Sequence, residues 1–187
     1  MARRGPGTLL LVVGPSGAGK DTLLDIARAR FGTDGRVLFA RRIVTRPAGA
    51  GEAHGTLDAD AFEALRVQGC FALAWRAHGL SYALGPEVGE KIAAGGVVVA
   101  NGSRATLPEA RERFARVRVV QVTAPVAVRA QRLAARGRER ADDIAERLSR
   151  TPDVDVAPDL LIENVGSPAE GGASLCSFIA AELAALA

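Results

Sequence analysis

The 187-residue sequence has no apolar run long enough to cross a membrane. A transmembrane helix needs roughly 20 apolar residues, whereas the apolar run in GTLLLVVG stops at a glycine after the length of one strand. The basic start MARRGPG precedes this run, but no small-residue cleavage site follows it, so we do not interpret it as a secretion signal. We interpret residues 8–13 as a buried first strand and expect no membrane partner.

Cysteine and aromatic residues are also scarce. Cys70 and Cys176 are too far apart in sequence to build a disulfide framework or a metal-binding motif, so we expect two buried thiols in a reducing cytoplasm. Aromatic residues make up only 4% of a composition that is 48% hydrophobic, which suits helices packed on a sheet better than a small β-barrel. The length is sufficient for one core with a small insertion, so we expect one domain over residues 1–187.

Lysine is rare too, so the basic side chains are nearly all arginine. Lys and Arg together number 24 against 21 Asp and Glu, which gives a net charge of +3. The planar guanidinium of arginine suits bidentate contact with phosphate. Because a GC-rich genome would produce the same bias without a functional cause, the positions of the arginines are more informative than their number.

The pattern that is present is an alternation of strands and helices. Short apolar runs predict strands at 8–13, 36–44, 95–102, 117–124 and 159–166. Helical spacing, with Asp58 and several prolines at helix starts, predicts helices at 22–30, 58–68, 86–94, 104–114, 125–136, 142–150 and 167–187. Such alternation is typical of an α/β fold with a parallel, doubly wound sheet flanked by helices.

The segment after the first predicted strand matches the phosphate-binding loop G-x-x-x-x-G-K at every fixed position. Its residues are Gly14, Pro15, Ser16, Gly17, Ala18, Gly19 and Lys20. In such a loop, backbone N–H groups and the positive end of the next helix converge on nucleotide phosphates. Lys20 would reach the β- and γ-phosphates. The predicted flanking strand and helix favour this interpretation over a plain glycine-rich turn, so we expect ATP as the co-substrate and Lys20 as a catalytic residue.

The residue after the loop lysine is unusual. Phosphate loops normally have Ser or Thr here to bind Mg²⁺, but this sequence has Asp21 and places Thr22 one position late. A carboxylate is also a suitable Mg²⁺ ligand, and the predicted strand end at 99–101 offers no acid. We predict that Asp21 binds Mg²⁺, directly or through water, with Thr22 as a further oxygen. The alternative is that Asp21 caps the helix or complements its dipole.

The phosphate loop and three later segments together resemble the guanylate kinase family over nearly the whole chain. The later segments are VTRPAGAGE, AWRAHGLSY and an arginine-rich pair of helices. The resemblance implies a P-loop nucleoside-monophosphate-kinase-like fold. Its core would comprise about 1–44 and 86–187, with a substrate-binding insertion at about 45–85 and a helical lid at about 129–150.

The same resemblance implies roles for individual residues. Arg46 and Tyr82 would hold the phosphate of the substrate. Asn164 would contact adenine, although a strand-ending turn explains this residue equally well. At the guanine-reading positions of the family, a serine is replaced by Arg42 and a glutamate by Leu73. A site that reads a base through hydrogen bonds loses discrimination without those partners, whereas Arg42 suits a more highly phosphorylated substrate without a base.

These departures, together with five motifs, resemble one branch of the family, the ribose 1,5-bisphosphate phosphokinases. The motifs are GPSGAGKD, TRP, WRAHGLSY, NGSR and RGRE. The resemblance implies ATP-dependent phosphorylation of ribose 1,5-bisphosphate to 5-phospho-α-D-ribose 1-diphosphate, in phosphonate breakdown or as a bypass that supplies this product.

Arginines mark the predicted lid. Phosphoryl transfer depends on positioning and charge neutralisation, and Arg129, Arg132 and Arg136 share one helix face. We predict that Arg132 contacts ATP, that Arg136 and Arg140 are catalytic, and that Arg147 contacts the substrate. Nearby acidic residues make a solvated, ion-paired surface the alternative for about half of the lid arginines.

The remaining substrate candidates lie near the predicted cleft. Asn101, Ser103 and Arg104 follow a strand, at the carboxyl end where α/β sheets usually bind ligands. His78 would be a hydrogen-bonding substrate contact or a structural residue at the Gly79 turn. Because the acceptor is already an ionised phosphate, no general base is required.

Two other functions fit parts of the pattern. One is a nucleotide kinase with GMP as the first candidate acceptor, and the other is a guanylate-kinase-like module that binds a protein without catalysis, which the intact Lys20 disfavours. Nucleic-acid binding is disfavoured because the arginines gather at the lid and cleft without exposed aromatic residues for stacking. We expect a cytoplasmic monomer or homodimer that acts on a small phosphorylated sugar.

Overall fold

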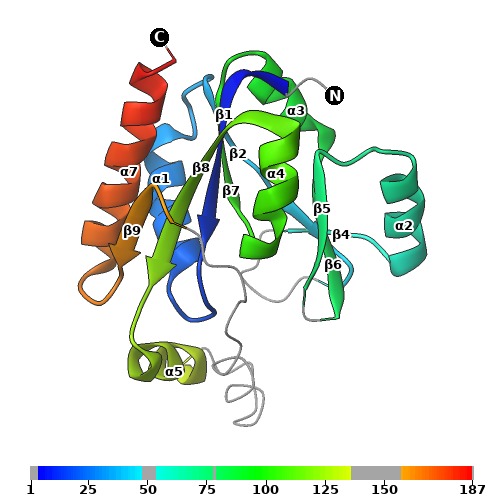
Figure 1. Cartoon of the computed structure of the whole chain (residues 1–187). Coiled ribbons are helices and arrows are strands. Elements are labelled where there is room, and N and C mark those ends of the chain that lie inside the picture. Colours follow the sequence, from blue (N-terminus) through cyan, green and yellow to red (C-terminus); the bar gives the residue numbers. More distant parts are fainter. Residues whose placement is uncertain (1–3, 48–53, 78, 136–156, 187) are drawn as a thin grey trace.

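Two β-sheets form the framework of the computed structural model, which describes residues 4–47, 54–77, 79–135 and 157–186 (Figure 1). The larger sheet has five strands in the order β2-β7-β1-β8-β9. These strands are β1 (Arg4–Val13), β2 (Val37–Phe39), β7 (Val97–Asn101), β8 (Phe114–Thr123) and β9 (Leu160–Glu163). All neighbouring strands run parallel. The predicted α/β fold with a parallel sheet is therefore confirmed.

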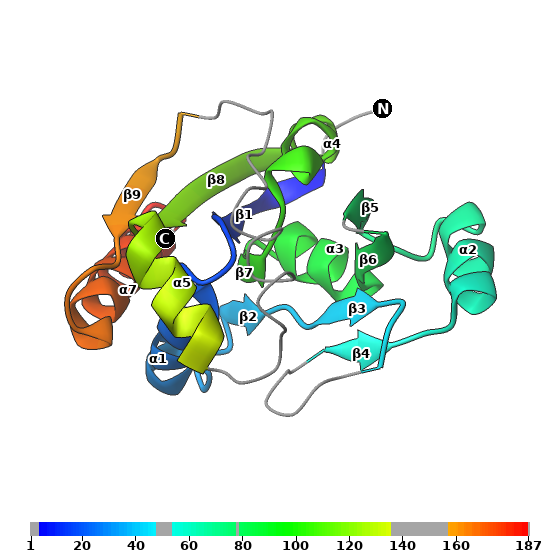
Figure 2. The same ribbon diagram turned by 90° about the horizontal axis from the view of Figure 1, so that it is seen from below.

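Helices cover both faces of this sheet (Figure 2). They are α1 (Lys20–Phe31), α3 (Pro86–Ala93), α4 (Leu107–Arg113) and α7 (Pro168–Ala184). Alternate residues of a strand point to opposite faces, so Leu10 and Val12 pack in the core beneath α1 and α7. Leu9 and Leu11 pack in the core beneath α3 and α4. Burial on both faces explains why the central strands are continuous apolar runs rather than alternating ones.

A smaller, mostly antiparallel sheet occupies the segment between β2 and α3. Its order is β4-β3-β6-β5, with strands β3 (Arg42–Val44), β4 (Gly55–Thr56), β5 (Leu73–Ala77) and β6 (Leu80–Leu84). Helix α2 (Ala59–Val67) packs on it through Phe62, whose ring centroid lies 4.9 Å from that of Phe71. Leu73 and Leu84 also belong to the core of the larger sheet, so the two sheets are joined by shared apolar packing.

The predicted strand at 36–44 is wrong as a single element. β2 ends at Phe39, and Ala40 makes a last backbone hydrogen bond of 2.9 Å to the Val99 carbonyl before the chain crosses to the smaller sheet as β3. Two charged residues, Arg41 and Arg42, follow at this point, and charged side chains are unfavourable in a parallel sheet whose faces are covered by helices. The Arg41 guanidinium instead donates a 2.9 Å hydrogen bond to the His54 carbonyl.

Two further expectations need correction. The helix expected over 104–114 divides into a 3₁₀ turn at Arg104–Thr106 and α4, and Phe114 begins β8 because its side chain, only 1% exposed, belongs to the sheet core. Of the two cysteines, only Cys176 is buried, whereas Cys70 is half-buried.

The predicted helix cap at Asp58 is confirmed, because its carboxylate accepts a 2.8 Å hydrogen bond from the Ala61 N–H. The helix expected over 142–150 lies outside the described residues.

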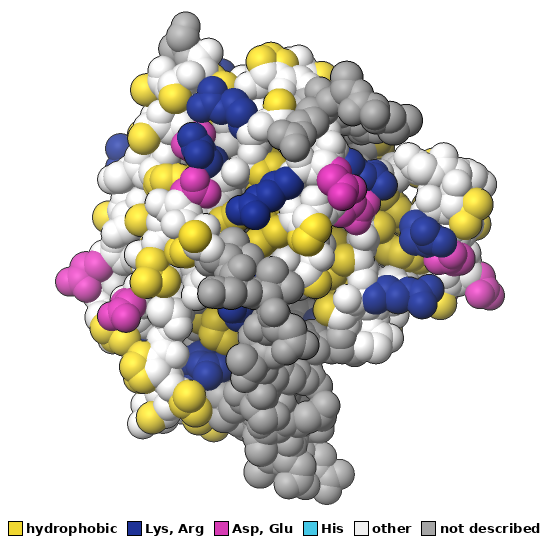
Figure 3. Space-filling view, in the orientation of Figure 1, with side chains coloured by type: hydrophobic (Ala, Val, Ile, Leu, Met, Phe, Trp, Pro, Cys, Tyr) yellow, Lys and Arg dark blue, Asp and Glu magenta, His cyan; other side chains and the backbone are white. Residues whose placement is uncertain are grey.

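The carboxyl ends of the central strands meet at one edge of the larger sheet, where α5 (Val126–Ala135) follows β8 (Figure 1). None of the helices in the described ranges is long and apolar enough to cross a bilayer. On the face shown in Figure 3, Lys and Arg side chains are interspersed with Asp and Glu side chains. The described part of that face therefore presents no extended basic surface.

Candidate active site

The predicted phosphate loop connects the end of β1 to the start of α1. Three glycines in it have positive φ angles, namely 143° at Gly14, 79° at Gly17 and 93° at Gly19. A side chain at these positions would be strained, and at Gly17 a Cβ would lie 2.8 Å from the Arg129 carbonyl oxygen. Glycine is therefore required twice over at Gly17, by the backbone conformation and by the close approach of α5.

Lys20 is the first residue of α1, at the positive end of the helix dipole. Its ammonium donates hydrogen bonds of 2.8 Å to the Gly14 carbonyl and 3.1 Å to the Pro15 carbonyl. The side chain thus curls back over the loop. This geometry places a positive charge directly above the helix start, where the electrostatics already favour an anion.

Asp21, the unusual residue, lies beside the end of β7. Its Oδ1 accepts a 2.7 Å hydrogen bond from the Asn101 amide nitrogen. Asn101 is 8% exposed, and its Oδ1 is buried without a hydrogen-bond partner in the described residues. The N-cap of α1 is Gly19 and no side-chain hydrogen bond caps the helix, whereas Asp21 lies in the first turn, where a carboxylate complements the helix dipole.

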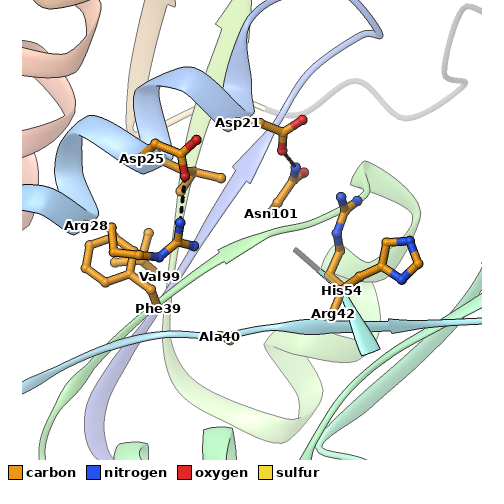
Figure 4. Close-up of a pocket in the computed structure, with 10 residues that line it drawn as sticks. Asp21, Asp25, Arg28, Phe39, Ala40, Arg42, His54, Val99 and Asn101 are labelled. Carbon is orange, nitrogen blue, oxygen red and sulfur yellow. Dashed lines mark hydrogen bonds and ion pairs between the residues drawn. The ribbon is translucent and has the colours of Figure 1, made fainter. Parts of the chain in front are cut away.

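A pocket opens next to this pair, between α1, the ends of β2 and β7, and the start of the smaller sheet (Figure 4). Its lining residues are Asp21, Leu24, Asp25, Arg28, Phe39, Ala40, Arg42, His54, Val99 and Asn101. Two residues predicted to bind substrate, Arg42 and Asn101, are among them. The α1 residues at 21, 24, 25 and 28 follow the spacing i, i+3, i+4 and i+7, so they share one helix face.

In the view of Figure 4, two arginines flank the Asp21–Asn101 pair. On one side, Arg28 makes a 2.6 Å ion pair with Asp25 and lies 5.4 Å from the centroid of the Phe39 ring. On the other side, Arg42 extends from β3 next to the pocket (Figure 4). A bound ligand would therefore meet positive charge at two separated points and carboxylates near one of them.

His54 lines the same pocket and is 4% exposed. Its Nδ1 lies 3.0 Å from the Gly55 carbonyl oxygen, and its own carbonyl accepts the Arg41 hydrogen bond. Sequence reasoning did not identify Arg28, Asp25, Phe39 or His54. Helical spacing from Asp21 would have indicated Asp25 and Arg28, whereas His54 reaches the pocket only through the fold of the smaller sheet.

Three predicted or neighbouring residues support the opposite side of the phosphate loop. Asn164, at the end of β9, is 4% exposed and donates a 2.8 Å hydrogen bond to the Ala18 carbonyl. Arg132 donates a 3.4 Å hydrogen bond to the same carbonyl from α5. Arg129 is 8% exposed, donates to the Ala124 carbonyl at 3.2 Å and keeps a buried Nη1 without a partner in the described residues. Both candidate nucleotide residues, Asn164 and Arg132, thus contact the loop itself.

The other predicted substrate residues lie apart from the pocket lining. Tyr82 of β6 stacks on Trp75 of β5 with ring centroids 5.5 Å apart. Arg46 donates a 3.3 Å hydrogen bond to the Pro47 carbonyl, and Ser103 accepts one of 3.3 Å from the Ala105 N–H as the cap of the 3₁₀ turn that begins at Arg104. Thr22 is exposed on α1 beside Asp21. His78, Arg136, Arg140 and Arg147 lie outside the described residues.

The donor atoms at the strand end fit a hard cation. Asp21 provides a carboxylate, and the unpaired Oδ1 of Asn101 is a further oxygen beside it. In the described part of the chain, no group of three His, Cys, Asp or Glu side chains is arranged to hold a metal by itself. Mg²⁺ bound with a nucleotide uses one or two carboxylates together with phosphate oxygens and waters, which is the donor set that this site could complete.

Comparisons with known proteins show the relatives of this chain. No family model matches it. It is 50% identical over 176 residues to the "Ribose 1,5-bisphosphate phosphokinase PhnN" of Methylobacterium radiotolerans, which covers 94% of this chain and 99% of that protein. It is 47% identical over 175 residues to the protein of the same name from Rhodopseudomonas palustris, covering 94% of this chain and 89% of that one.

Among solved structures, the guanylate kinase of Anaplasma phagocytophilum superposes with a TM-score of 0.68 at 18% identity, over 97% of this chain and 88% of the other. At this identity, the likeness concerns the fold. The fold is therefore that of a guanylate kinase, whereas the sequence similarity identifies the family: the chain belongs to the ribose 1,5-bisphosphate phosphokinases.

Proposed function

We propose that this protein transfers the γ-phosphoryl group of ATP, with Mg²⁺, to ribose 1,5-bisphosphate and forms 5-phospho-α-D-ribose 1-diphosphate. The observation that carries the proposal is the pocket beside the phosphate loop, which has an arginine on each side, one of them, Arg42, at a position where guanylate kinases read the base. The family membership gives the same acceptor, since the relatives at about half identity are named for it.

A purine acceptor fits this pocket poorly. Leu73, at the position of the family's base-reading glutamate, is fully buried in the apolar core and offers no hydrogen bond. Arg42 replaces the serine of the family and brings a charge in its place. A purine base buried here would find no hydrogen-bond partners for its polar edge, so the enzyme would strongly disfavour it as an acceptor. Ribose 1,5-bisphosphate instead carries phosphates at two ends. Arg42 provides one cation, and Arg28, which is paired with Asp25, provides a second at a separate point.

The chemistry follows from charge rather than from a protein base. The acceptor oxygen belongs to the 1-phosphate, which is already ionised, so proton abstraction is not needed. Lys20 would leave the loop carbonyls for the β- and γ-phosphates, and the loop N–H groups would hold the nucleotide. Mg²⁺, when bound, neutralises developing charge between the β- and γ-phosphates. Asp21 is the carboxylate that would hold the ion, with Thr22 as a neighbouring hydroxyl.

Other residues would complete the site around this centre. Arg132 and Asn164 would contact the nucleotide from the side on which they support Ala18. Arg136 and Arg140 of the lid would neutralise the transferred group, and Arg147 would contact the acceptor. Further substrate contacts are proposed for Arg46, His78, Tyr82, Ser103 and Arg104. In this view, the smaller sheet and the lid act as substrate-binding parts of one domain, which works in the cytoplasm as a monomer or homodimer.

An acceptor panel tests the proposal. Purified protein is given Mg²⁺–ATP and one of three acceptors, ribose 1,5-bisphosphate, ribose 5-phosphate or GMP, and ADP release is followed in a coupled assay. We expect turnover with ribose 1,5-bisphosphate at a kcat/KM at least about 10³-fold above that with GMP, because a polar base meets no partners. Equal or faster turnover of GMP would replace this function by a nucleotide kinase. ATP binding without turnover of any acceptor would indicate a non-catalytic module.

A further inference from the structure

The hydrogen bond between Asn101 and Asp21 joins two elements that are 80 positions apart in sequence. Asn101 ends β7 and is 8% exposed, so its amide is held by the sheet. Asp21 lies on the first turn of α1 and is exposed toward the pocket. We therefore take the buried Asn101 amide as the group that orients the exposed Asp21 carboxylate.

The orientation of the Asn101 amide is determined by its neighbour. Nδ2 lies 2.7 Å from Asp21 Oδ1, and the opposite orientation would place two acceptor oxygens against each other. As a result, Asn101 Oδ1 is left buried without a partner in the described part of the chain. Leaving a buried acceptor unpaired is unfavourable for folding, so this arrangement indicates a function other than stability.

Charge gives the reason for an asparagine at this strand end. P-loop enzymes commonly place an acid here as a metal ligand, but a second carboxylate 2.7 Å from Asp21 would prevent both from being ionised together. The neutral amide avoids this conflict while it still holds Asp21. The other carboxylate in the pocket, Asp25, is compensated by its ion pair with Arg28.

We propose that Asn101 is a positioning residue that orients the Asp21 carboxylate toward the Mg²⁺ of a bound Mg²⁺–ATP complex. P-loop enzymes usually have the carboxylate at the strand end and an uncharged side chain after the loop lysine, and in this chain the two are exchanged. The inference rests on the proposed function only in that the loop binds Mg²⁺–ATP. It does not depend on the acceptor, because the experiment that tests it contains no sugar.

The test measures the affinity for ATP by calorimetry, once with Mg²⁺ and once with EDTA. The affinity with Mg²⁺ divided by the affinity with EDTA is the gain due to Mg²⁺. For Asn101→Ala we expect the affinity in EDTA to stay near that of the parent, while the gain due to Mg²⁺ falls about 10–100-fold, as for other groups that orient metal ligands. Asp21→Asn should lose at least as much. Equal losses in both solutions, or a gain that stays at the parent's value, would overturn the proposal.

The control for Asn101→Ala is Thr106→Val. Thr106 is 1% exposed and donates a 2.7 Å hydrogen bond to the Ser103 carbonyl near the same strand end, so the variant also loses one buried hydrogen bond. We expect it to leave the gain due to Mg²⁺ unchanged. A loss equal to that of Asn101→Ala would assign the effect to general loosening of the strand end and would also overturn the proposal.

A double variant decides the matter if Asn101→Ala does not fold. Asp21→Asn with Asn101→Asp restores one amide, one carboxylate and one negative charge, with the carboxylate now on the strand. We expect this double variant to recover most of the gain due to Mg²⁺ that Asp21→Asn loses. If the double variant gains no more from Mg²⁺ than Asp21→Asn does, the two residues do not act as an exchanged pair.

Discussion

At the amino-end half of the five-stranded sheet, the buried Glu182 has hydrogen-bond partners for both carboxylate oxygens. At the carboxyl end, three buried side chains each keep a polar atom that has no partner within the described ranges. Glu182 accepts hydrogen bonds of 3.0 Å from Arg118 Nε and 3.3 Å from Thr8 Oγ1. Arg118 also reaches Asp159 at 3.0 Å. The unpaired atoms belong to Asn101, Arg129 and Asn164, all around the phosphate loop.

This difference separates stability from function. Each unsatisfied buried polar group lowers the free energy of unfolding by about 1–3 kcal/mol. The arrangement at the carboxyl end therefore destabilises the fold. Glu182, and after it Asp159, raise the pKa of Arg118. Arginine is charged at every ordinary pH, so the ion pairs of Arg118 at the amino end persist. We expect variants at the two ends to affect different measurements.

The largest expected effect is on activity. Replacing Lys20 by Ala should lower kcat at least about 10²-fold, because a preorganised charge on the transferred group is lost. The free energy of unfolding should change by no more than about 1 kcal/mol, since the two lysine hydrogen bonds are only partly buried. Steady-state kinetics and chemical denaturation of the same preparation test both parts. Retained turnover would remove the phosphate-loop assignment.

A second prediction concerns Arg42 and the acceptor. Arg42→Met keeps most of the apolar stem but removes the cation, so we expect KM for ribose 1,5-bisphosphate to rise about 10–100-fold, the range for loss of a charge-assisted hydrogen bond of about 1.5–3 kcal/mol. KM for ATP should stay within about twofold, because the role proposed for Arg42 is contact with the acceptor and not with the nucleotide. The matched control is Arg76→Met on β5, whose side chain is 81% exposed and outside the pocket. Equal effects of both variants would contradict an acceptor role for Arg42.

The third prediction sharpens the comparison from the amino end. Glu182→Gln should lower the free energy of unfolding by about 1–3 kcal/mol, because it removes the buried charge that pairs with Arg118. This loss is smaller than for breaking a fully buried ion pair, because Arg118 is 40% exposed and its charge is partly screened by solvent. Below the melting temperature, kcat should be unchanged. A double-mutant cycle with Arg118→Met should show a coupling of about 0.5–3 kcal/mol, and additive effects would contradict the network.

The smallest effect is expected at Asp34, in the turn between α1 and β2. The Arg36 side chain and backbone N–H donate hydrogen bonds to this carboxylate and lower its pKa from 3.8 to about 2. A lowered pKa in the folded state means that the stabilisation is present above pH 3.8 and is lost as the pH falls through about 2. Asp34→Asn should therefore differ slightly from the parent at neutral pH, and the difference should shrink as the pH falls from 3.8 through about 2, as measured by urea denaturation. A difference that grows on acidification would have the wrong sign.

Much of the fold could be predicted from the sequence because its signals are local. The apolar run 8–13, the glycine loop and the Asp58 cap each determine structure within a few residues. The error at 36–44 arose because the strand signal continues through the point where the chain changes sheets, and only tertiary pairing of Phe39 with Val99 and of Arg42 with Leu84 separates the two strands.

The site was predictable in part for the same reason. The loop motif identified Lys20 and Asp21, and a family resemblance identified Arg42. The pairing of Asp21 with Asn101 was not predicted, since nothing in the sequence relates two residues in different elements. Arg28 was missed although its spacing from Asp21 placed it on the same helix face. His54 had no sequence signal, because its position depends on how β4 meets β3.

Competition between acceptors tests the central claim most directly. The protein is incubated with Mg²⁺–ATP and equal concentrations of ribose 1,5-bisphosphate and GMP, and the products are resolved by phosphorus NMR. We predict resonances of a sugar 1-diphosphate, coupled to each other as α- and β-phosphates, with GMP unchanged until the sugar is consumed. Formation of GDP in preference to the sugar diphosphate would contradict the claim that this pocket binds a doubly phosphorylated pentose.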